Sequence, residues 1–519
     1  MALAAFAVVW LAYQFWLLPV LTDWVSSAVD EGFVSYAAQR IRDGAWPHRD
    51  FFYLWTPGTP LLHALLQALG ADWRAERACA LLASAGTSLL VMRWARDWAL
   101  PSFERALLAA LLAVWSFSLW NIPYSSWYAV FFALLAMRLT GRTLAGAGLV
   151  FALAFWFKQN VGLLALCGEA AWRLTRGDRR AAARLVAYGA LGIAVPFGAL
   201  AALGGGFALS QALYQIFLFP LRYPFLMGQG LSADEMAAPL TSLGLWILSL
   251  FFLRKDSASR SARLIQVGLL GYVATYFFRA PDAFTRGGFV LLSLVAWPIS
   301  LAVALTEPDR RDAWRFWLPA LGIFLQVFPR ADFQHFLFVF PLVSLLLVGA
   351  LARIRARYAW VPSGWTVLPL LLLLVGGIAF QAHVVDTRLA GRADSLGRIS
   401  TGGGARLDEE VSAVRRYLRG EGLREGDPIL VLPNATSVYL WTGFHDPTPH
   451  LQFFPGYVEA FGASQADVLP KYRAAGGRFL VVQERSYLET DVPEIWRQIQ
   501  REYRVVKSFP EHFTIYAPL

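Results

Sequence analysis

The chain has few charged residues and very little cysteine or lysine. Of its 519 residues only 16% are charged, and two are cysteines. Cys79 and Cys167 both lie in apolar stretches, so we expect neither a disulfide framework nor a cysteine-based metal site. A soluble domain of this length would carry more charge, which argues against a soluble protein. The lysines are Lys158, Lys255, Lys471 and Lys507.

Apolar residues are abundant instead, and they come in long blocks. The chain is 57% hydrophobic and has a mean hydropathy of +0.46. Blocks of this kind predict a mainly α-helical membrane protein that crosses the bilayer many times. A formal net charge of +10 can indicate nucleic-acid binding. Because most of the excess arginine falls between apolar blocks, we attribute the charge to membrane topology and expect no nucleic-acid partner.

The apolar blocks predict about thirteen membrane-spanning segments, at roughly 20 residues each. The shorter apolar stretch 57–70 is expected to lie along the membrane surface. The first block has no basic leader and no clear cleavage site, so we expect it to be a retained anchor. The predicted spans are 3–21, 75–95, 103–120, 124–140, 144–158, 160–175, 184–203, 239–253, 264–279, 287–305, 314–328, 333–352 and 362–382.

Basic residues are distributed unevenly between the loops that join these spans. Alternate loops are rich in arginine, and by the positive-inside rule those loops are cytoplasmic. The N-terminus is then cytoplasmic, whereas the loop after the first span and the chain beyond residue 382 lie outside. We expect the inner membrane of a bacterium, with a periplasmic C-terminal domain. The basic loops include Arg93, Arg96 and Arg105, then Arg138 and Arg142, and then Arg173, Arg176, Arg179 and Arg180.

Composition changes near residue 385 and divides the chain into two parts. Residues 1–384 are expected to form a transmembrane domain, and residues 385–519 a small α/β domain. The stretch 383–406 is rich in glycine and arginine and is expected to be a linker. The C-terminal part has no Walker loop and no Gly-x-Gly-x-x-Gly motif. Its predicted helices are 407–419, 464–475 and 492–501, and its predicted strands are 428–433, 478–482 and 503–509.

Aromatic and histidine residues recur within this C-terminal part. Side chains of these types can line a sugar-binding surface, although in such numbers they more often pack in a core. The residues concerned are Tyr439, Trp441, His445, His450 and Tyr457.

Two adjacent carboxylates, Asp30 and Glu31, follow the first predicted span directly. One interpretation is structural: an amphipathic helix begins here, with Asp30 as its N-cap and Glu31 in its first turn. The other is functional: a carboxylate beside the bilayer can accept a proton from a hydroxyl group. Spacing alone leaves both interpretations open.

Lys158 and Gln159 follow an apolar block at the predicted outer surface of the membrane. A lysine in this position can simply extend its amine to the interface. However, Lys158, Gln159 and Asn160 are three consecutive polar residues, which is more than anchoring requires. A departing phosphate would need such a cation.

Two further predicted outer turns carry arginine beside apolar segments. Arg330 and His335 could hold a phosphate, with Asp332 orienting either side chain. The alternative is a helix that Asp332 caps. Arg279 and Arg286 flank a similar turn, where anchoring at the interface is the simpler explanation.

The order of motifs in the first outer loop, residues 22–74, resembles that of the GT-C glycosyltransferases. One span is followed by Asp30-Glu31, then by Gly44-Ala45-Trp46-Pro47, by Asp50 and by two prolines at 57 and 60. The resemblance is greatest to the branch that contains protein O-mannosyltransferases and lipid A aminoarabinose transferases. It covers the whole chain in architecture, but its motifs fall mainly within residues 23–94.

This resemblance implies a membrane enzyme that uses a polyprenyl-phosphate sugar, with Asp30 as the catalytic carboxylate. Glu31 matches the second position of the acidic pair, whose role is less settled. His48, Asp50 and Tyr53 of the same loop are then candidates for substrate binding. One departure matters: relatives often have Lys-Pro-Pro where this chain has Thr56-Pro57-Gly58. A donor contact made there by lysine must come from another residue.

The first functional hypothesis is glycosyl transfer with inversion at the outer face of the membrane. Asp30 would take the proton of the acceptor hydroxyl, and the phosphate would leave toward Lys158 and one or more of the arginines named above. The acceptor could be a glycan, a lipid or a protein. No metal cluster of suitable spacing occurs, so no obligate metal is expected, with a cation at Asp30 left open.

Two alternatives belong to other classes of protein. A transporter or lipid flippase would need charged residues near the middle of the membrane, whereas the charges here fall at the ends of spans. A non-catalytic scaffold of a cell-envelope glycan pathway would leave Asp30 dispensable.

Overall fold

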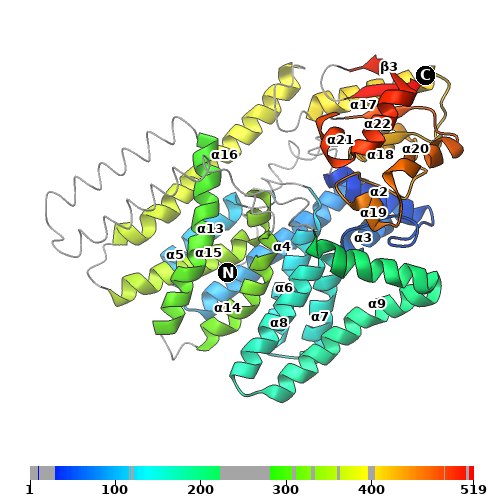
Figure 1. Ribbon diagram of the computed structural model, residues 1–519. Coiled ribbons are helices and arrows are strands. Elements are labelled where there is room, and N and C mark those ends of the chain that lie inside the picture. The colour runs from blue at the N-terminus through cyan, green and yellow to red at the C-terminus, as the bar shows by residue number, and fades with distance from the viewer. Residues whose placement is uncertain are drawn as a thin grey trace.

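The computed structural model describes residues 10, 30–115, 117, 122–222, 281–306, 311–328, 333–358, 363–394, 404–483, 485–509 and 513–519. These residues are mostly helical and contain one small four-stranded sheet near the C-terminus (Figure 1). The fold class expected from the sequence, mainly α with a small C-terminal α/β part, is therefore found.

The apolar blocks form the helices of a large bundle. Every predicted span that falls among the described residues overlaps one of these helices, whereas 239–253 and 264–279 lie outside those residues, as does 3–21 apart from Trp10. The helices are α4 (Trp73–Asp97), α5 (Ser102–Val114), α6 (Ser125–Leu139), α7 (Leu144–Phe157), α8 (Gln159–Thr175), α9 (Arg179–Leu213), α13 (Pro281–Thr306), α14 (Arg311–Phe324), α15 (Phe333–Arg357) and α16 (Ser363–Asp394).

Three stretches of this bundle are long and apolar enough to cross a membrane by themselves. They are Trp73–Asp97, Arg179–Ala202 and Gln334–Arg357. The other apolar stretches found among the described residues are shorter, namely Ser125–Leu139, Leu144–Phe157, Phe289–Leu305 and Val367–Ala382, so a total of thirteen spans stays a prediction. The orientation of the chain in the membrane likewise stays a prediction.

Side-chain caps fix where several helices begin. The Asp72 carboxylate accepts a hydrogen bond from the Arg74 amide, which starts α4. Thr143 and Asp178 cap α7 and α9 in the same way. Gly205, with a φ of +73°, interrupts α9, and a π-helix (Tyr214–Leu218) follows it. The chain after α9 thus stays helical as far as Leu221.

The C-terminal sheet has the strand order β1-β2-β4-β3. β1 (Leu430–Leu432) and β2 (Leu480–Val482) are parallel, and β4 (Thr514–Pro518) runs antiparallel to both β2 and β3 (Tyr503–Ser508). The surrounding helices are α17 (Gly404–Gly420), α18 (Ser437–Thr442), α19 (Tyr457–Ala460), α20 (Gln465–Ala474), α21 (Arg485–Asp491) and α22 (Pro493–Glu502).

The three predicted strands and three predicted helices of this part are all confirmed, to within a few residues. The sequence did not predict β4, α18, α19 or α21. The predicted linker is wrong in its first half, because α16 continues without a break to Asp394. Residues 395–403, in the second half, lie outside the described residues.

Two short helices, α2 (Asp30–Arg42) and α3 (Gly58–Ala68), lie between the bundle and the C-terminal sheet (Figure 1). The rings of Tyr36 and Tyr439 stack with their centroids 4.6 Å apart. The Tyr36 hydroxyl also accepts a hydrogen bond of 2.8 Å from the Asp446 amide. Gly32 is required at this contact, since a Cβ on it would lie 2.3 Å from the Ser437 nitrogen. The C-terminal part thus packs directly on α2.

Candidate functional site at α2

The acidic pair marks the start of α2, which begins at Asp30. The side chain of Asp30 lies outside the described residues. Glu31 is buried and makes a bidentate ion pair: Arg77 Nε is 2.7 Å from Glu31 Oε1, and an Arg77 terminal nitrogen is 2.6 Å from Oε2. The Arg77 guanidinium also lies over the Trp73 ring, 4.5 Å from its centroid. Burial raises the pKa of Glu31, against the opposing effect of Arg77.

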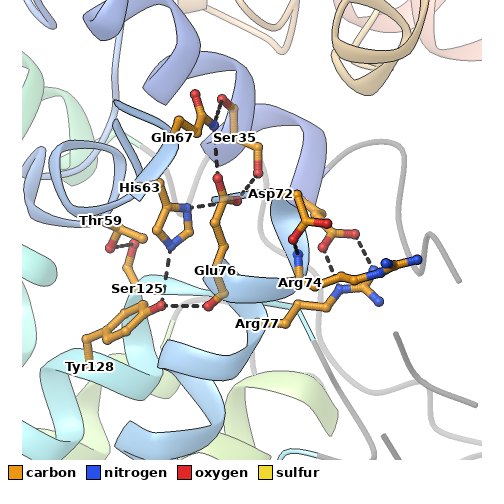
Figure 2. Close-up of polar contacts among 11 residues, drawn as sticks. Ser35, Thr59, His63, Gln67, Asp72, Arg74, Glu76, Arg77, Ser125 and Tyr128 are labelled. Carbon is orange, nitrogen blue, oxygen red and sulfur yellow. Dashed lines mark hydrogen bonds and ion pairs between the residues drawn. The ribbon is translucent and has the colours of Figure 1, made fainter. Parts of the chain in front are cut away.

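A second buried carboxylate, Glu76, sits beside this ion pair at the start of α4. Ser35 of α2 donates a hydrogen bond to Glu76 Oε2, and Gln67 of α3 donates one of 2.9 Å to Oε1. His63 of α3 places its Nδ1 3.2 Å from Glu76 Oε2. Figure 2 shows these side chains converging on one carboxylate. We call Glu31, Ser35, His63, Gln67, Glu76 and Arg77 the α2 layer.

Helix α6 closes the α2 layer from below. The Tyr128 hydroxyl donates to the backbone oxygen of Glu76 at 3.2 Å and lies 3.3 Å from Nε2 of His63. One turn earlier, Thr59 donates a 2.9 Å hydrogen bond to Ser125 (Figure 2). Buried polar side chains are costly unless they are hydrogen-bonded, so these contacts hold α2, α3, α4 and α6 in one arrangement.

A cavity of about 230 Å³ opens between the α2 layer and the C-terminal part. Trp73 stands on one wall, and Leu440 and Trp441 of α18 stand on another. The cavity is polar along α2 and α3, which is what a hydroxyl-rich ligand would need. Its lining residues are Glu31, Gly32, Ser35, Gln39, Arg42, Gln67, Asp72, Trp73, Glu76, Ser437, Leu440 and Trp441.

Lys158 lies between α7 and α8, where it is the C-cap residue of α7 and the N-cap residue of α8. It is only 5% exposed. Its amine donates a 2.8 Å hydrogen bond to Ser126 and lies 5.6 Å from the centroid of the Tyr124 ring. Lys158 therefore contacts the same N-terminal end of α6 that also carries Ser125 and Tyr128.

The segment after α2 is tied to this turn through Thr56. The Thr56 hydroxyl donates to the backbone oxygen of Phe155 at 2.6 Å, and the Thr56 amide donates to Gln159 Oε1 at 3.3 Å. The Gln159 amide group in turn donates to the backbone oxygens of Leu54 and Ile216, both at 3.3 Å. The polar run Lys158-Gln159-Asn160 makes Gln159 a candidate for substrate binding, but its side chain is occupied by these backbone contacts.

His48 and Tyr53 both meet Gln215 of the π-helix. His48 Nδ1 is 2.8 Å from Gln215 Oε1, and the same oxygen accepts from the Tyr53 amide at 3.1 Å. Burial lowers the pKa of His48 to about 4, so its ring is neutral at physiological pH. Neither His48 Nε2 nor the Tyr53 hydroxyl has a hydrogen-bond partner in the described chain, although both are buried.

Asp50 lies at the surface of this loop rather than in the cavity. Its carboxylate accepts a 2.7 Å hydrogen bond from the Trp46 amide and pairs with Arg49 at 2.6 Å. Partial burial raises the pKa of Asp50. The hydrogen bonds from Arg49 and Trp46 and the positive charges of Arg49 and Arg40 outweigh that effect and keep the pKa below its usual value. Asp50 stabilises the turn that carries His48.

Of the remaining candidate residues, only His335 has a described side chain. His335 lies in the first turn of α15 with its ring 6.3 Å from that of Phe338. Arg279, Arg330 and Asp332 lie outside the described residues, as does the side chain of Arg286. Among the described residues, no group of three or more histidine, cysteine, aspartate or glutamate side chains could hold a metal ion.

The sequence analysis missed Ser35, His63, Glu76 and Arg77. A signal was present, because Glu76 and Arg77 are adjacent charged residues at the edge of an apolar helix, where charges are seldom placed without a partner. Of the aromatic residues suggested in the C-terminal part, Trp441 does line the cavity. Tyr439 is instead buried, and its hydroxyl accepts from the Val431 amide at 2.8 Å.

A different polar cluster lies at the other end of α4, about 35 Å away at the rise of an α-helix. Arg138 pairs with Asp97. Arg173 lies 3.2 Å from Glu169 and donates to the Thr140 backbone oxygen at 3.1 Å. We call Asp97, Arg138, Thr140, Glu169, Arg173 and Arg315 the arginine layer, in which Arg315 donates to the Thr140 hydroxyl at 2.9 Å.

Comparison with known proteins finds likenesses among solved structures. No protein-family model and no curated protein matches the chain. Among solved structures, it is similar to a crystal structure of ArnT from Cupriavidus metallidurans bound to undecaprenyl phosphate. The two are 14% identical, the match covers 99% of this chain and 98% of that chain, and the TM-score is 0.47. At this identity and TM-score the likeness assigns no activity to this chain.

Proposed function

We propose that the protein is an integral-membrane glycosyltransferase of the GT-C type, which moves a sugar from a polyprenyl-phosphate donor to an acceptor at the outer face of the membrane. One observation carries the proposal. The acidic pair begins a helix whose first turn borders a cavity shared by the bundle and the C-terminal part. Carboxylates at the end of an apolar bundle, beside a cavity with polar and aromatic walls, suit a reaction between a lipid-linked donor and a polar acceptor.

Asp30 is assigned as the general base, and Glu31 as a positioning residue. Both oxygens of Glu31 are engaged by Arg77, so Glu31 is not available to accept a proton from a substrate. The buried pair instead fixes the first turn of α2, and with it the backbone of Asp30. A base held on a rigid helix needs little reorganisation when the acceptor arrives.

The reaction is a single displacement. The acceptor oxygen forms a bond to the anomeric carbon, and the bond from that carbon to the phosphate oxygen breaks. The hydroxyl proton goes to Asp30, and the bonding electrons leave with the polyprenyl phosphate. Attack from the side opposite the phosphate inverts the anomeric carbon.

Lys158 is proposed to meet the departing phosphate. It lies between Phe155 and Gln159, the two residues that hydrogen-bond to Thr56. Position 56 is where relatives often carry lysine, so Lys158 brings a cation to nearly the same place from a different helix. Arg279, Arg286 and Arg330 stay candidates for additional phosphate contacts.

The acceptor is proposed to enter the cavity beside α2. Trp73 and Trp441 offer aromatic faces, and Gln39, Arg42 and Gln67 offer hydrogen-bond donors. Flat aromatic faces with nearby amides suit the ring of a sugar. The acceptor could therefore be a glycan or the sugar headgroup of a lipid.

Replacing Asp30 with asparagine tests the proposal directly. Asparagine still begins a helix well, so a purely structural Asp30 predicts near-normal activity. A general base predicts a loss of turnover of at least about 100-fold. The measurement is loss of donor by purified protein in lipid vesicles, using a panel of polyprenyl-phosphate sugars.

Asp43→Asn is the matched control. Asp43 follows the other end of α2, and among the described residues its side chain forms only an exposed ion pair with Arg42 at 3.5 Å. Its replacement should leave turnover unchanged. Wild-type turnover by Asp30→Asn would refute the catalytic assignment. Movement of a labelled lipid across the vesicle without any change in the donor would instead support a flippase.

A further inference from the structure

A second cavity of about 270 Å³ lies at the opposite end of the bundle, between α4 and α6. It is separate from the α2 layer, and the proposed transfer reaction makes no use of it. Its lining consists of three leucines and three arginines: Leu90, Arg93, Leu135, Arg138, Leu139 and Arg142.

The two residue types are arranged in layers. Each leucine stands three positions before an arginine, in the pairs Leu90/Arg93, Leu135/Arg138 and Leu139/Arg142. Both α4 and α6 run toward this end, where α4 ends at Asp97 and α6 at Leu139. In the pairs Leu90/Arg93 and Leu135/Arg138 the leucine lies about 4.5 Å further into the bundle at the rise of a helix, whereas Leu139 ends α6 and Arg142 follows in the turn beyond it. The cavity is thus apolar at its inner end and basic at its mouth.

The positive charge at the mouth is only partly neutralised. Asp97 pairs with Arg138, and it lies 3.8 Å from Arg93, whose side chain is 48% exposed. The side chain of Arg142 makes no hydrogen bond or ion pair with any residue in the described ranges, and its amide bonds only to the Leu139 backbone oxygen at 2.8 Å. Three guanidinium groups therefore face one carboxylate.

We propose that this cavity binds an anionic phospholipid of the surrounding membrane. The lipid phosphate would lie at Arg93 and Arg142, and the start of an acyl chain would lie against Leu90, Leu135 and Leu139. Guanidinium groups suit phosphate because they donate two parallel hydrogen bonds. Basic pockets between membrane helices on the cytoplasmic side are a recognised form of lipid-headgroup site.

Membrane topology alone accounts for arginine at this end, but not for the layering. The positive-inside rule requires basic loops and makes no demand on the residues one turn deeper. Arg179 and Arg180 belong to the same class of loop, are exposed, and line neither of the cavities described here. They provide a control with equal charge.

The test is native mass spectrometry of the purified protein titrated with phosphatidylglycerol or phosphatidylcholine of identical acyl chains. Wild-type protein should prefer phosphatidylglycerol. The double replacement Arg93→Gln with Arg142→Gln should weaken that binding by about tenfold or more, at the usual strength of two basic contacts to lipid. Arg138 is left in place because its removal would leave Asp97 without its closest partner.

Three outcomes would overturn the proposal. One is the absence of any preference for phosphatidylglycerol in the wild type. Another is an equal loss of binding in Arg179→Gln with Arg180→Gln, which would mean that only diffuse charge matters. The third is displacement of the lipid by an equal concentration of inorganic phosphate, which would identify a free anion as the occupant.

Two further single variants test the basic mouth and the apolar inner end of the cavity separately. Arg142→Gln alone breaks no side-chain hydrogen bond or ion pair among the described residues, so it should fold normally and still weaken phosphatidylglycerol binding. Leu135→Gln keeps every charge, and it should weaken binding of long-chain more than of short-chain phosphatidylglycerol. Unchanged lipid binding in both variants would refute the assigned cavity.

Discussion

The α2 layer and the arginine layer are both polar clusters at the ends of the same helix, α4, and they are built differently. The arginine layer joins helix ends through charge: Arg173 and Arg315 both bond to Thr140, and Arg138 pairs with Asp97. The α2 layer combines two carboxylates with serine, histidine, glutamine and a single arginine. Only the α2 layer is covered by a second part of the chain, with a cavity between them.

The difference separates two reasons for placing charge at a membrane surface. Arginines at helix ends follow from the direction in which a chain is inserted into the membrane, and in the arginine layer they pair with Thr140, Asp97 and Glu169. A cluster in which four elements converge on buried carboxylates is held in a single geometry. The second kind suits chemistry, because the positions of its groups are fixed before a substrate binds.

The largest expected effect comes from breaking the Glu31–Arg77 pair. Arg77→Ala leaves a buried carboxylate without its partner and should lower the free energy of unfolding by about 3–5 kcal/mol. Arg138→Ala in the arginine layer should cost no more than about 1 kcal/mol, because Arg138 and Asp97 are partly exposed. The measurement is thermal or denaturant unfolding in detergent, with both variants prepared alike.

A double variant sharpens this comparison. Glu31→Leu combined with Arg77→Met replaces the pair by apolar side chains and should be more stable than either single variant. Additive losses in the double variant would mean that the two residues act independently. Equal losses for Arg77→Ala and Arg138→Ala would erase the proposed difference between the two layers.

The sequence predicts the helices of both layers because their information is local. Runs of apolar residues leave few alternatives to a helix in a membrane, and short β-branched runs mark β1, β2 and β3. β4 was missed although it lies between β2 and β3, since the stretch from Thr514 to Pro518 is short and ends in proline. Its place in the sheet depends on strands that precede it in the chain.

The contacts of the α2 layer are less predictable because its residues are distant in sequence. Ser35 and Glu76 are 41 positions apart, and Glu31 and Arg77 are 46 apart. The Asp30-Glu31 motif predicted the start of a helix, and α2 does begin at Asp30, but nothing local shows that Arg77 engages Glu31. The hydrogen bonds of the Gln159 side chain could not be predicted either. Its partners are backbone groups of Leu54, Thr56 and Ile216, which are distant in sequence.

The next effect concerns Asp446, where the C-terminal part meets α2. Burial raises the pKa of Asp446 from 3.8 to about 6, and one carboxylate oxygen has no partner in the described chain. A raised pKa gives stability that is present below about pH 4 and is lost as pH rises through about 6. Asp446→Asn should therefore be more stable than wild type at pH 7.5, by up to about 3 kcal/mol, and about equal to it at pH 4. Unfolding measured from pH 4 to 8 decides this, and a difference independent of pH would contradict it.

A smaller effect is expected from adding a methyl group at the contact between α2 and the C-terminal part. Gly32→Ala would place a Cβ 2.3 Å from the Ser437 nitrogen, so the two helices must separate. Overpacking of this kind should lower the free energy of unfolding by about 1–3 kcal/mol. It should also loosen the contact between α2 and α18 at the wall of the cavity. Gly420→Ala is the control, because a Cβ there meets nothing within 4 Å. Faster proteolysis of the C-terminal part in both variants, or in neither, would argue against a close contact at Gly32.

The smallest effect, and the one most specific to catalysis, concerns Lys158. If its amine binds the donor phosphate, Lys158→Met should raise the apparent donor constant by about tenfold, at the lower end of the strength of a charge-assisted hydrogen bond. Turnover should fall as well if the phosphate gains charge as it leaves. Ser126→Ala separates this role from packing, since it removes the hydroxyl that Lys158 contacts at 2.8 Å and keeps the cation. Donor-dependent initial rates, normalised to folded protein, should therefore change in Lys158→Met and hardly at all in Ser126→Ala. Unaltered donor kinetics in Lys158→Met would make this lysine a structural group, comparable to the arginines at the other end of the bundle, and would leave Asp30 as the remaining link between the α2 layer and the reaction.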